Sequence, residues 1–239
     1  MTQGHLYIAF DQEYDTLAAA SVLNLRKFSQ LPVCVLTNLS FDLRDDNWDD
    51  IKNVTFTEIP DKHNRDIKTR MIDFTPFDET LYTDTDTLIL SEQFMLVFDV
   101  LKFFDLAFPC HNIDESVRKF SSAAFKQAVI DFKIKLPALI YQGGVCVFKK
   151  NKQSKNFFNR WNSYWNVRKF RDMPPLVAAV QQSNNVNIGI LPETIGFPDS
   201  KILQHFYGYR PPVTNKLPQI IKQWANETSN SWVPRTMFR

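Results

Sequence analysis

The chain has 239 residues, 44% of them hydrophobic, which suits one sizeable α/β domain with a buried core and leaves little room for two. Its 28 basic side chains nearly balance 26 acidic ones, and the formal net charge is +2. Because the charges are balanced and no long run of one sign occurs, composition argues against a nucleic-acid-binding protein.

Short β-rich runs alternate with amphipathic stretches, which is the pattern of a mainly parallel sheet flanked by helices. Residues 6–10 form the first predicted strand. Apolar residues at three- and four-residue spacing from Leu17 to Phe28 then predict a helix that begins near Asp15 or Thr16. Further strands are predicted at residues 32–36, 54–59, 81–83, 106–108 and 145–148.

Three connecting stretches are less regular. Residues 41–50 are polar and acidic and predict a loop or a short surface helix, and residues 61–74 predict a turn and a helix. Residues 151–170 place Phe157, Phe158, Trp161 and Trp165 along one side of a helix that also carries basic residues. We favour packing of these rings on the sheet over an amphipathic anchor that makes weak peripheral contact with a membrane.

The amino-terminal residues MTQGHLYIAF lack a basic leader segment, and no apolar run reaches the roughly 18 residues that a spanning helix needs. The cysteines Cys34, Cys110 and Cys146 lie in apolar surroundings without the spacing of a metal or redox motif. We therefore expect a soluble protein with reduced core thiols, in a cytoplasmic, reducing compartment.

The stretch LYTDTDTLIL, residues 81–90, places Asp84 and Asp86 inside an apolar, β-branched run. Residues at i and i+2 share a face of a strand, and two unpaired carboxylates side by side repel. Carboxylates are hard ligands for Mg²⁺ or Mn²⁺, and ligands of open α/β sheets gather at the carboxyl ends of strands. The pair therefore predicts a metal and diphosphate site. Alternatively, one aspartate caps a turn and the other pairs with a distant base.

The same stretch resembles the strand and Asp-x-Asp element of GT-A glycosyltransferases, in particular the retaining galactosyltransferase and glycogenin-like family. Four other segments match in order, and together they span residues 6–212. They are AFDQEY at 9–14, IKTRMIDFTPFDETLY at 67–82, YQGGVCVFKKN at 141–151 and LQHFYGYRPP at 203–212. The resemblance implies one GT-A domain over residues 1–239. Its nucleotide-binding half is 1–110, its acceptor and donor-sugar half is 111–212, and 213–239 is a tail.

The resemblance also implies the roles of individual residues. Asp84, Asp86 and His205 would hold Mn²⁺ or Mg²⁺, with Asp84 also at the ribose of the donor. Taken alone, His205 beside Phe206 would rather be a core histidine with a satisfied hydrogen bond, and the resemblance reverses that preference. The other residues implied at the nucleoside of the donor are Ala9, Asp11 and Tyr14, with Lys68 or Arg70 nearby. Gly208 and Arg210 would lie at the diphosphate, and Arg210 stands where the family usually has a lysine.

Two residues would lie at the reacting sugar. Gln142 occupies the position of an amide beneath the sugar, and Asp172 matches an Asp-Gln pair whose second member here is Met173. Because Met173 replaces the glutamine of that pair, the resemblance does not imply which sugar the donor carries. Asp172 has a structural explanation as well, because an aspartate just before a helix that starts near Pro174 suits an N-cap.

The implied activity is the metal-dependent transfer of a hexose from a nucleotide sugar, a UDP-hexose, to a hydroxyl of a carbohydrate or other acceptor, with retention. An inverting reaction would instead need Asp172, Asp114 or Glu115 as a general base. Two alternatives stay open: a nucleotide-sugar-binding protein of the same fold without turnover, and a sugar nucleotidyltransferase. The second is less favoured, because the loop FDQEY lacks the glycine and basic residues such enzymes place after the first strand.

Overall fold

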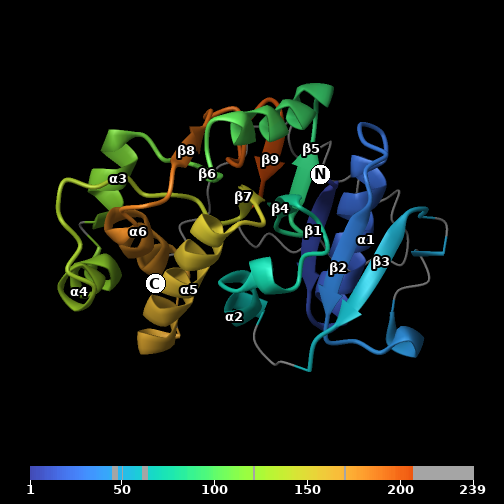
Figure 1. Ribbon diagram of the computed structural model, residues 1–239, viewed down its shortest axis with the longest axis horizontal. Coiled ribbons are helices and arrows are strands. Elements are labelled where there is room, and N and C mark those ends of the chain that lie inside the picture. Colours follow the sequence, from blue (N-terminus) through green and yellow to red (C-terminus); the bar gives the residue numbers. More distant parts are fainter. Residues whose placement is uncertain (45–47, 50, 61–63, 121, 170, 207–239) are drawn as a thin grey trace.

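The computed structural model describes residues 1–44, 48–49, 51–60, 64–120, 122–169 and 171–206 (Figure 1). Within these residues the centre is a seven-stranded sheet in the order β3-β2-β1-β4-β7-β6-β8, beside a two-stranded sheet, β5-β9. The strands are β1 (Gln3–Ala9), β2 (Val33–Thr37), β3 (Val54–Glu58), β4 (Glu79–Thr83), β5 (Thr87–Ile89), β6 (Leu106–Pro109), β7 (Val145–Lys149), β8 (Ile188–Leu191) and β9 (Leu203–His205).

Helices cover both faces of the large sheet. They are α1 (Asp11–Leu25), α2 (Asn64–Lys68), α3 (Ile113–Phe120), α4 (Ala123–Asp131), α5 (Lys152–Arg168) and α6 (Met173–Gln182), with the 3₁₀ segments η1 (Phe41–Leu43), η3 (Met71–Asp73) and η4 (Glu92–Lys102). In the part of the chain that the structure describes, no helix has the length and apolar character needed to cross a membrane.

The strand directions bring several carboxyl ends to one edge of the sheet. β1 is parallel to β2 and to β4, with Leu6 opposite Tyr82. β7 runs antiparallel to both β4 and β6, so β6 points the same way as β4. Side chains that follow β1, β2, β4 and β6 therefore lie along the same edge, where open α/β sheets bind their ligands.

The small sheet ties the last described strand to the middle of the chain. β5 follows the acidic pair directly, and it pairs antiparallel with β9 so that Thr87 lies opposite His205. The Phe206 N–H donates to the carbonyl of Asp86 at 3.0 Å, which extends the pairing by one step. A residue late in the sequence is thus held beside the acidic pair by backbone hydrogen bonds.

Alternating side chains of the central strands divide the core into two layers. Tyr7 and Leu81 belong to the layer under α1 and η4, whereas Leu6 and Tyr82 belong to the layer under α5 and α6. This is the period-two alternation that buries a strand on both faces. A third cluster joins α4 to the outer side of α6.

The packing interpretation of the aromatic helix is confirmed. Phe157, Phe158 and Trp161 of α5 are fully buried, and Trp165 is 3% exposed. Phe157 and Trp161 both contact Phe108 of β6 through their rings. These rings are therefore unavailable to a bilayer. Arg168 and Lys169, the basic residues of the same hypothesis, are exposed, and the weak peripheral contact with a membrane stays a prediction.

Most predicted elements are present, with one clear correction at α1. The helix begins at Asp11 rather than near Asp15 or Thr16, and it ends at Leu25 before Phe28. Asp11 enters it with φ 68°, and its N–H donates to Asn38 Oδ1 at 2.8 Å. A side chain that follows β2 thus bonds the first turn of α1, a contact that helical periodicity cannot reveal.

The buried cysteines agree with the sequence analysis. Cys34, Cys110 and Cys146 are all free thiols in the interior. Burial raises the pKa of Cys110 to about 11 and that of Cys146 well above its ordinary value. The thiols are therefore protonated and unreactive at neutral pH.

Candidate metal centre

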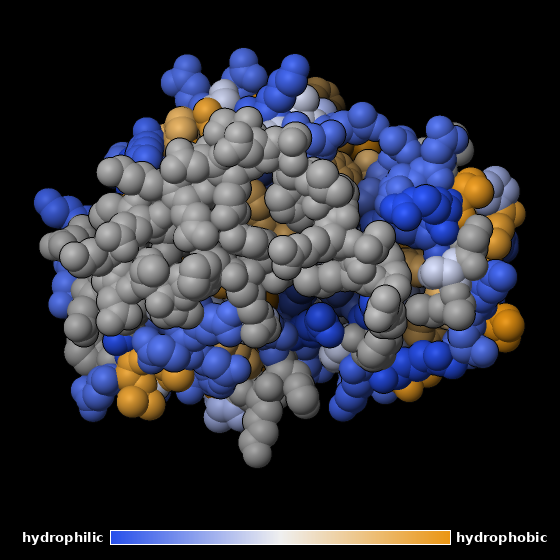
Figure 2. Space-filling view, turned by 180° about the vertical axis from the view of Figure 1, so that it is seen from behind, coloured by the Kyte–Doolittle hydropathy of each residue, from blue (hydrophilic) through white to orange (hydrophobic). Residues whose placement is uncertain are grey.

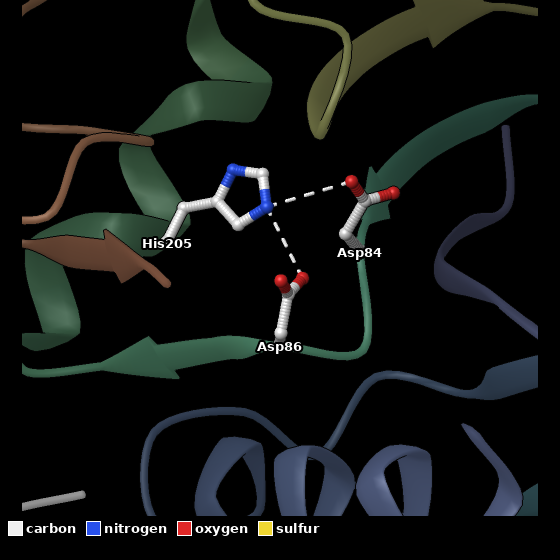
Figure 3. Close-up of side chains that lie close together, drawn as sticks. All are labelled: Asp84, Asp86 and His205. Carbon is white, nitrogen blue, oxygen red and sulfur yellow. Dashed lines mark ion pairs between the residues drawn. The ribbon is translucent and has the colours of Figure 1, made fainter. Parts of the chain in front are cut away.

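The acidic pair lies in the link between two strands. β4 ends at Thr83 and β5 begins at Thr87, so Asp84 and Asp86 do not share the face of one strand as their spacing predicted. The Asp84 N–H donates to the carbonyl of Gly144 at 2.7 Å, and Thr87 Oγ1 donates to the Asp84 carbonyl at 2.8 Å. These bonds fix the link in a conformation that turns both carboxylates toward β9 (Figure 3).

His205 completes a three-residue group. Its Nε2 lies 3.1 Å from Asp86 Oδ1 and 3.5 Å from Asp84 Oδ2, as the dashed lines in Figure 3 show. One ligand atom of each residue lies within 4.8 Å of the others, a separation that one divalent ion can bridge after small side-chain movements. Two carboxylates with one imidazole form a donor set suited to Mn²⁺ or Mg²⁺.

The His205 imidazole is buried, but the neighbouring carboxylates favour its protonated form. Burial lowers the pKa of His205, while the Asp86 and Asp84 carboxylates raise it, and the net shift is upward. The side chain is 5% exposed, against 12% for Asp86 and 24% for Asp84. Water therefore reaches this group mainly beside Asp84.

Gly144 has no side chain at the point where His205 and Asp84 approach each other. A Cβ at this position would lie 2.7 Å from His205 Nδ1 and 2.8 Å from Asp84 Oδ2, closer than real Cβ contacts. At Gly143 the corresponding contacts are 3.5 Å, ordinary van der Waals distances. The absence of a side chain is thus required at Gly144 for His205 and Asp84 to approach each other, whereas Gly143 tolerates one.

Lys68 joins the acidic pair to Asp172. Its Nζ lies 3.0 Å from Asp84 Oδ1 and 3.1 Å from Asp172 Oδ2. Burial alone would lower the pKa of Lys68, but the Asp172 and Asp84 carboxylates outweigh burial and raise it above the ordinary value. Of the two basic residues considered for the donor, Lys68 therefore lies at the acidic pair, whereas Arg70 bonds Asp66 on its own surface turn.

Asp172 serves as an ion-pair partner and not as a helix cap. It precedes α6 with helical backbone angles and makes no capping hydrogen bond, so the N-cap expectation is wrong. Its carbonyl instead accepts from Trp161 Nε1 at 3.0 Å. Burial raises the pKa of Asp172, but the Lys68 ammonium outweighs burial and holds it below the usual range.

Tyr82 belongs to the site although sequence reasoning did not select it. It is 2% exposed, and its hydroxyl donates to Asp84 Oδ1. Burial and the neighbouring Asp84 carboxylate raise the pKa of Tyr82 well above its ordinary value, so it remains a donor. Its position two residues before Asp84, the spacing at which side chains of a strand share a face, was the available signal.

Gln142 lies next to the imidazole. It is 3% exposed, its amide oxygen accepts from the Gly144 N–H, and its amide nitrogen contacts His205 Nδ1. Side chains that contact the remaining nitrogen of a ligating histidine orient its ring. Gln142 is therefore placed to set the orientation of His205.

The residues expected at the nucleoside follow β1 at the same edge. Ala9 ends the strand and is fully buried, Asp11 is exposed at the start of α1, and Tyr14 is half-buried one turn later. Asn38 Nδ2 donates to Asp11 Oδ1 at 3.2 Å, so Asn38 positions the Asp11 carboxylate. Sequence reasoning missed Asn38, which stands outside every matching segment.

Comparison with known proteins identifies the architecture. No family model matches the chain, and no curated protein matches it. Among solved structures, the galactosyltransferase LgtC in complex with donor and acceptor sugar analogues is similar over 97% of this chain and 98% of its own, with TM-score 0.67 and 10% identity. The chain has the GT-A glycosyltransferase fold.

Two further GT-A structures give the same result. Mouse xyloside xylosyltransferase 1, in its apo form, matches 89% of this chain and 100% of its own, with TM-score 0.59 and 11% identity. The apo structure of the bifunctional glycosyltransferase WbbM matches 94% of this chain but 50% of its own, with TM-score 0.67 and 14% identity. The likeness therefore extends over nearly the whole chain.

The structure brings most of the predicted residues together on the GT-A sheet. Asp84, Asp86, His205, Lys68 and Asp172 form one connected network of ion pairs. Gly208, Arg210 and the tail at 213–239 lie outside the described residues, so their implied roles stay predictions.

Proposed function

We propose that the chain is a metal-dependent glycosyltransferase that moves a hexose from a nucleotide sugar, a UDP-hexose, to a hydroxyl acceptor with retention. The observation that carries this proposal is the convergence of Asp84, Asp86 and His205 at the carboxyl end of β4, in the fold that glycosyltransferases share. The implied cofactor is Mn²⁺ or Mg²⁺, and the implied partners are the donor and a carbohydrate or other hydroxyl acceptor.

The chemistry requires negative charge to be stabilised on the departing diphosphate. A divalent ion held by Asp84, Asp86 and His205 supplies that stabilisation when bound. Lys68 lies 3.0 Å from Asp84 and keeps its charge at neutral pH, so it adds a fixed cation beside the same carboxylate. Gln142 and Tyr82 hold His205 and Asp84 in place, which keeps the ligand atoms oriented before the donor binds.

Retention is favoured because two of the three candidate general bases, Asp172 and Glu115, are held in ion pairs. The Asp172 carboxylate pairs with Lys68 at 3.1 Å, and Glu115 accepts two hydrogen bonds from Arg118. These interactions hold the pKa of both carboxyl groups below the usual range, which makes them weak bases. An inverting reaction needs a base able to take the proton of the acceptor hydroxyl.

A thermal-shift panel tests nucleotide and metal binding. The protein is heated with UDP, GDP and UDP-hexoses, with and without Mn²⁺. A ligand at 100 times its dissociation constant adds about 2.7 kcal/mol of stability, so the melting temperature should rise by several degrees for UDP with Mn²⁺. Equal melting curves with and without UDP and Mn²⁺ would reject the proposal.

Turnover separates the enzyme from its alternatives. Release of UDP and a glycosylated acceptor is expected, and the anomeric configuration of the product is read by proton NMR. Stabilisation by UDP-hexose and Mn²⁺ without hydrolysis or transfer would instead favour the non-catalytic binding protein. Formation of UDP-hexose from UTP and a sugar phosphate would favour the nucleotidyltransferase.

A further inference from the structure

Positive charge is concentrated in one part of the chain. From residue 118 to residue 171 the sequence holds 13 lysines and arginines and a single acidic residue, Asp131, whereas the whole chain holds 28 and 26. This part contains α4, the loop that follows it, β7 and α5. An asymmetry of this kind indicates contact with a negatively charged partner, and the fold decides which of the charges share a surface.

The ends of α4 and α5 lie side by side. Asp131, the last residue of α4, forms an ion pair with Arg168, the last residue of α5. The loop after α4 is fixed to α6, because the Lys135 N–H donates to Gln181 Oε1 at 2.8 Å and Gln181 Nε2 donates to the Lys135 carbonyl at 2.7 Å. The two helix ends and this loop therefore form one surface, at the side of the molecule far from β3 (Figure 1), which we call the α4–α5 surface.

The exposed side chains of the α4–α5 surface are of two kinds. Three aliphatic residues, Ile130, Leu136 and Val167, are 69%, 54% and 63% exposed. Around them stand four exposed lysines, for which the described part of the chain supplies no ion pair: Lys126, Lys133, Lys135 and Lys169. In Figure 2, hydrophobic residues lie next to hydrophilic ones on this side of the molecule, at the right of the view. Single exposed aliphatic residues are common, but here three share a surface with four unpaired cations.

Two of the lysines occupy backbone positions that favour glycine. Lys133 follows α4 with φ 53°, and Lys169 ends α5 with φ 51°. Helices often end in this left-handed conformation, usually with glycine, because a Cβ makes it less favourable. The helix dipole favours a cation at either position, but it does not account for the aliphatic side chains beside them. Lysine at both positions keeps two long cationic side chains on the α4–α5 surface.

The kind of apolar residue favours lipid over nucleic acid as the partner. Proteins that bind single-stranded nucleic acids combine cations with exposed aromatic rings that stack on the bases. The rings of Phe157 and Trp161 on α5 are instead fully buried. Aliphatic side chains among lysines suit the boundary of a bilayer, where the ammonium groups reach anionic headgroups and the apolar groups enter the acyl region.

We propose that the α4–α5 surface docks on an anionic lipid bilayer. Ile130, Leu136 and Val167 enter the headgroup layer, and the four lysines contact the anionic headgroups. The contact is peripheral, and it does not depend on the proposed catalytic activity. Lys169 comes three residues before Asp172, so docking holds the candidate site close to the lipid surface.

Vesicle sedimentation with the full chain tests the proposal. The protein should sediment with vesicles of phosphatidylcholine and phosphatidylserine at low salt, and not with vesicles of phosphatidylcholine alone. Lys133→Gly combined with Lys169→Gly should weaken this partitioning about 25-fold, roughly fivefold for each lysine. Because glycine suits both backbone positions, this variant should keep the stability of wild type in urea unfolding. Lys27→Ala combined with Lys52→Ala removes two exposed charges at the opposite end of the sheet and should bind vesicles like wild type.

A second variant tests the apolar part of the surface at constant charge. Ile130→Ser combined with Leu136→Ser changes two exposed side chains and should weaken partitioning about tenfold. Vesicle binding that neither variant changes would place the contact elsewhere and overturn the proposal. Binding of a single-stranded RNA in fluorescence anisotropy, without binding of vesicles, would assign the surface to nucleic acid instead. A dimer in light scattering that the serine variant dissociates, again without vesicle binding, would assign it to a second copy of the chain.

Discussion

Asp84 is contacted by three other side chains of the site. Lys68 contacts both of its oxygens, Tyr82 donates to Oδ1, and His205 lies 3.5 Å from Oδ2. Oδ1 therefore receives Lys68 and Tyr82, whereas Oδ2 receives Lys68 and also faces His205 and the position of a Cβ at Gly144. Asp86, which contacts His205 at 3.1 Å, supplies the second carboxylate.

Asp86→Asn should abolish tight binding of Mn²⁺. The substitution keeps the shape of the side chain and removes one of two anionic ligands, so the affinity should fall by more than about 100-fold, beyond the effect of losing an outer partner. Isothermal titration calorimetry measures it. Asp99→Asn, an exposed carboxylate on η4, changes the net charge equally and should have no effect. Equal affinities for the two variants would contradict the assigned ligands.

Adjacent glycines make a second residue-scale test. Gly144→Ala should destabilise the fold by about 1–3 kcal/mol and weaken Mn²⁺ binding, because the new methyl group displaces His205 or Asp84. Gly143→Ala should be close to neutral, since its Cβ meets neighbours at 3.5 Å. Urea unfolding and Mn²⁺ titration of both variants give the comparison. Similar losses in both would show that the turn, and not the metal centre, requires glycine.

At the scale of elements, one ion pair joins α2 to the start of α6. Lys68 is the last residue of α2, and Asp172 immediately precedes α6. Between them, the Trp161 indole of α5 bonds the Asp172 carbonyl. Three helices on one face of the sheet are thus anchored at the candidate site by two polar contacts.

The Lys68–Asp172 pair predicts a pH-dependent contribution to stability. The pKa of Asp172 is lowered on folding, so its contribution is complete above the ordinary value of 3.8 and is lost as the pH falls through the folded pKa. Asp172→Asn should therefore be roughly 1–3 kcal/mol less stable at pH 7, less than a fully orphaned buried charge costs because Asp84 still pairs with Lys68. Urea unfolding from pH 7 to pH 2.5 should show the difference shrinking, and a constant difference would contradict it.

The aromatic side of α5 predicts a large effect of a single truncation. Trp161→Ala removes a fully buried indole and should cost about 3–5 kcal/mol of unfolding free energy. Val167→Ala, on the same helix at 63% exposure, should stay within about 0.5 kcal/mol of wild type. Chemical denaturation measures both. A mild effect at Trp161 would mean that the ring is not part of the core.

At the scale of the whole molecule, the folded sheet shields every cysteine. Because all three thiols are buried, a colorimetric thiol reagent should react slowly with the native protein and with three thiols after unfolding in guanidinium. The melting temperature should not change with a reducing agent, because the structure contains no disulfide among these cysteines. Rapid reaction of one thiol in the native state would place it at the surface.

Composition and periodicity predicted the long buried strands of the large sheet better than the short strands and some of the helices. The apolar runs that became β1, β2, β4 and β7 are buried on both faces and therefore visible in sequence. β5 and β9 have three residues each, too few to show a period, and they form because each pairs with the other. The helices α3 and α4 and the strand β8 were not predicted either.

Some residues of the candidate site were predicted from the sequence, and others are recognised only in the fold. Asp84 and Asp86 were predicted from their own spacing in an apolar run, whereas His205 was found through resemblance, because order and spacing along the chain carry that signal. Tyr82 and Asn38 act through contacts that only folding creates; Asn38 stands outside every matching segment, and Tyr82 stands in one without a role that the resemblance implied. The steric demand at Gly144 likewise depends on a histidine far away in the chain.

The pairing of β5 with β9 makes assembly of the candidate metal centre depend on a strand that is synthesised long after the acidic pair. A nascent chain that has left the ribosome only as far as β8 carries both aspartates but lacks the imidazole that β9 delivers. Such an intermediate can build most of the large sheet while it holds only two of the three candidate ligands. The three ligand atoms come together only when β9 pairs with β5, so the candidate centre forms at a late step of folding.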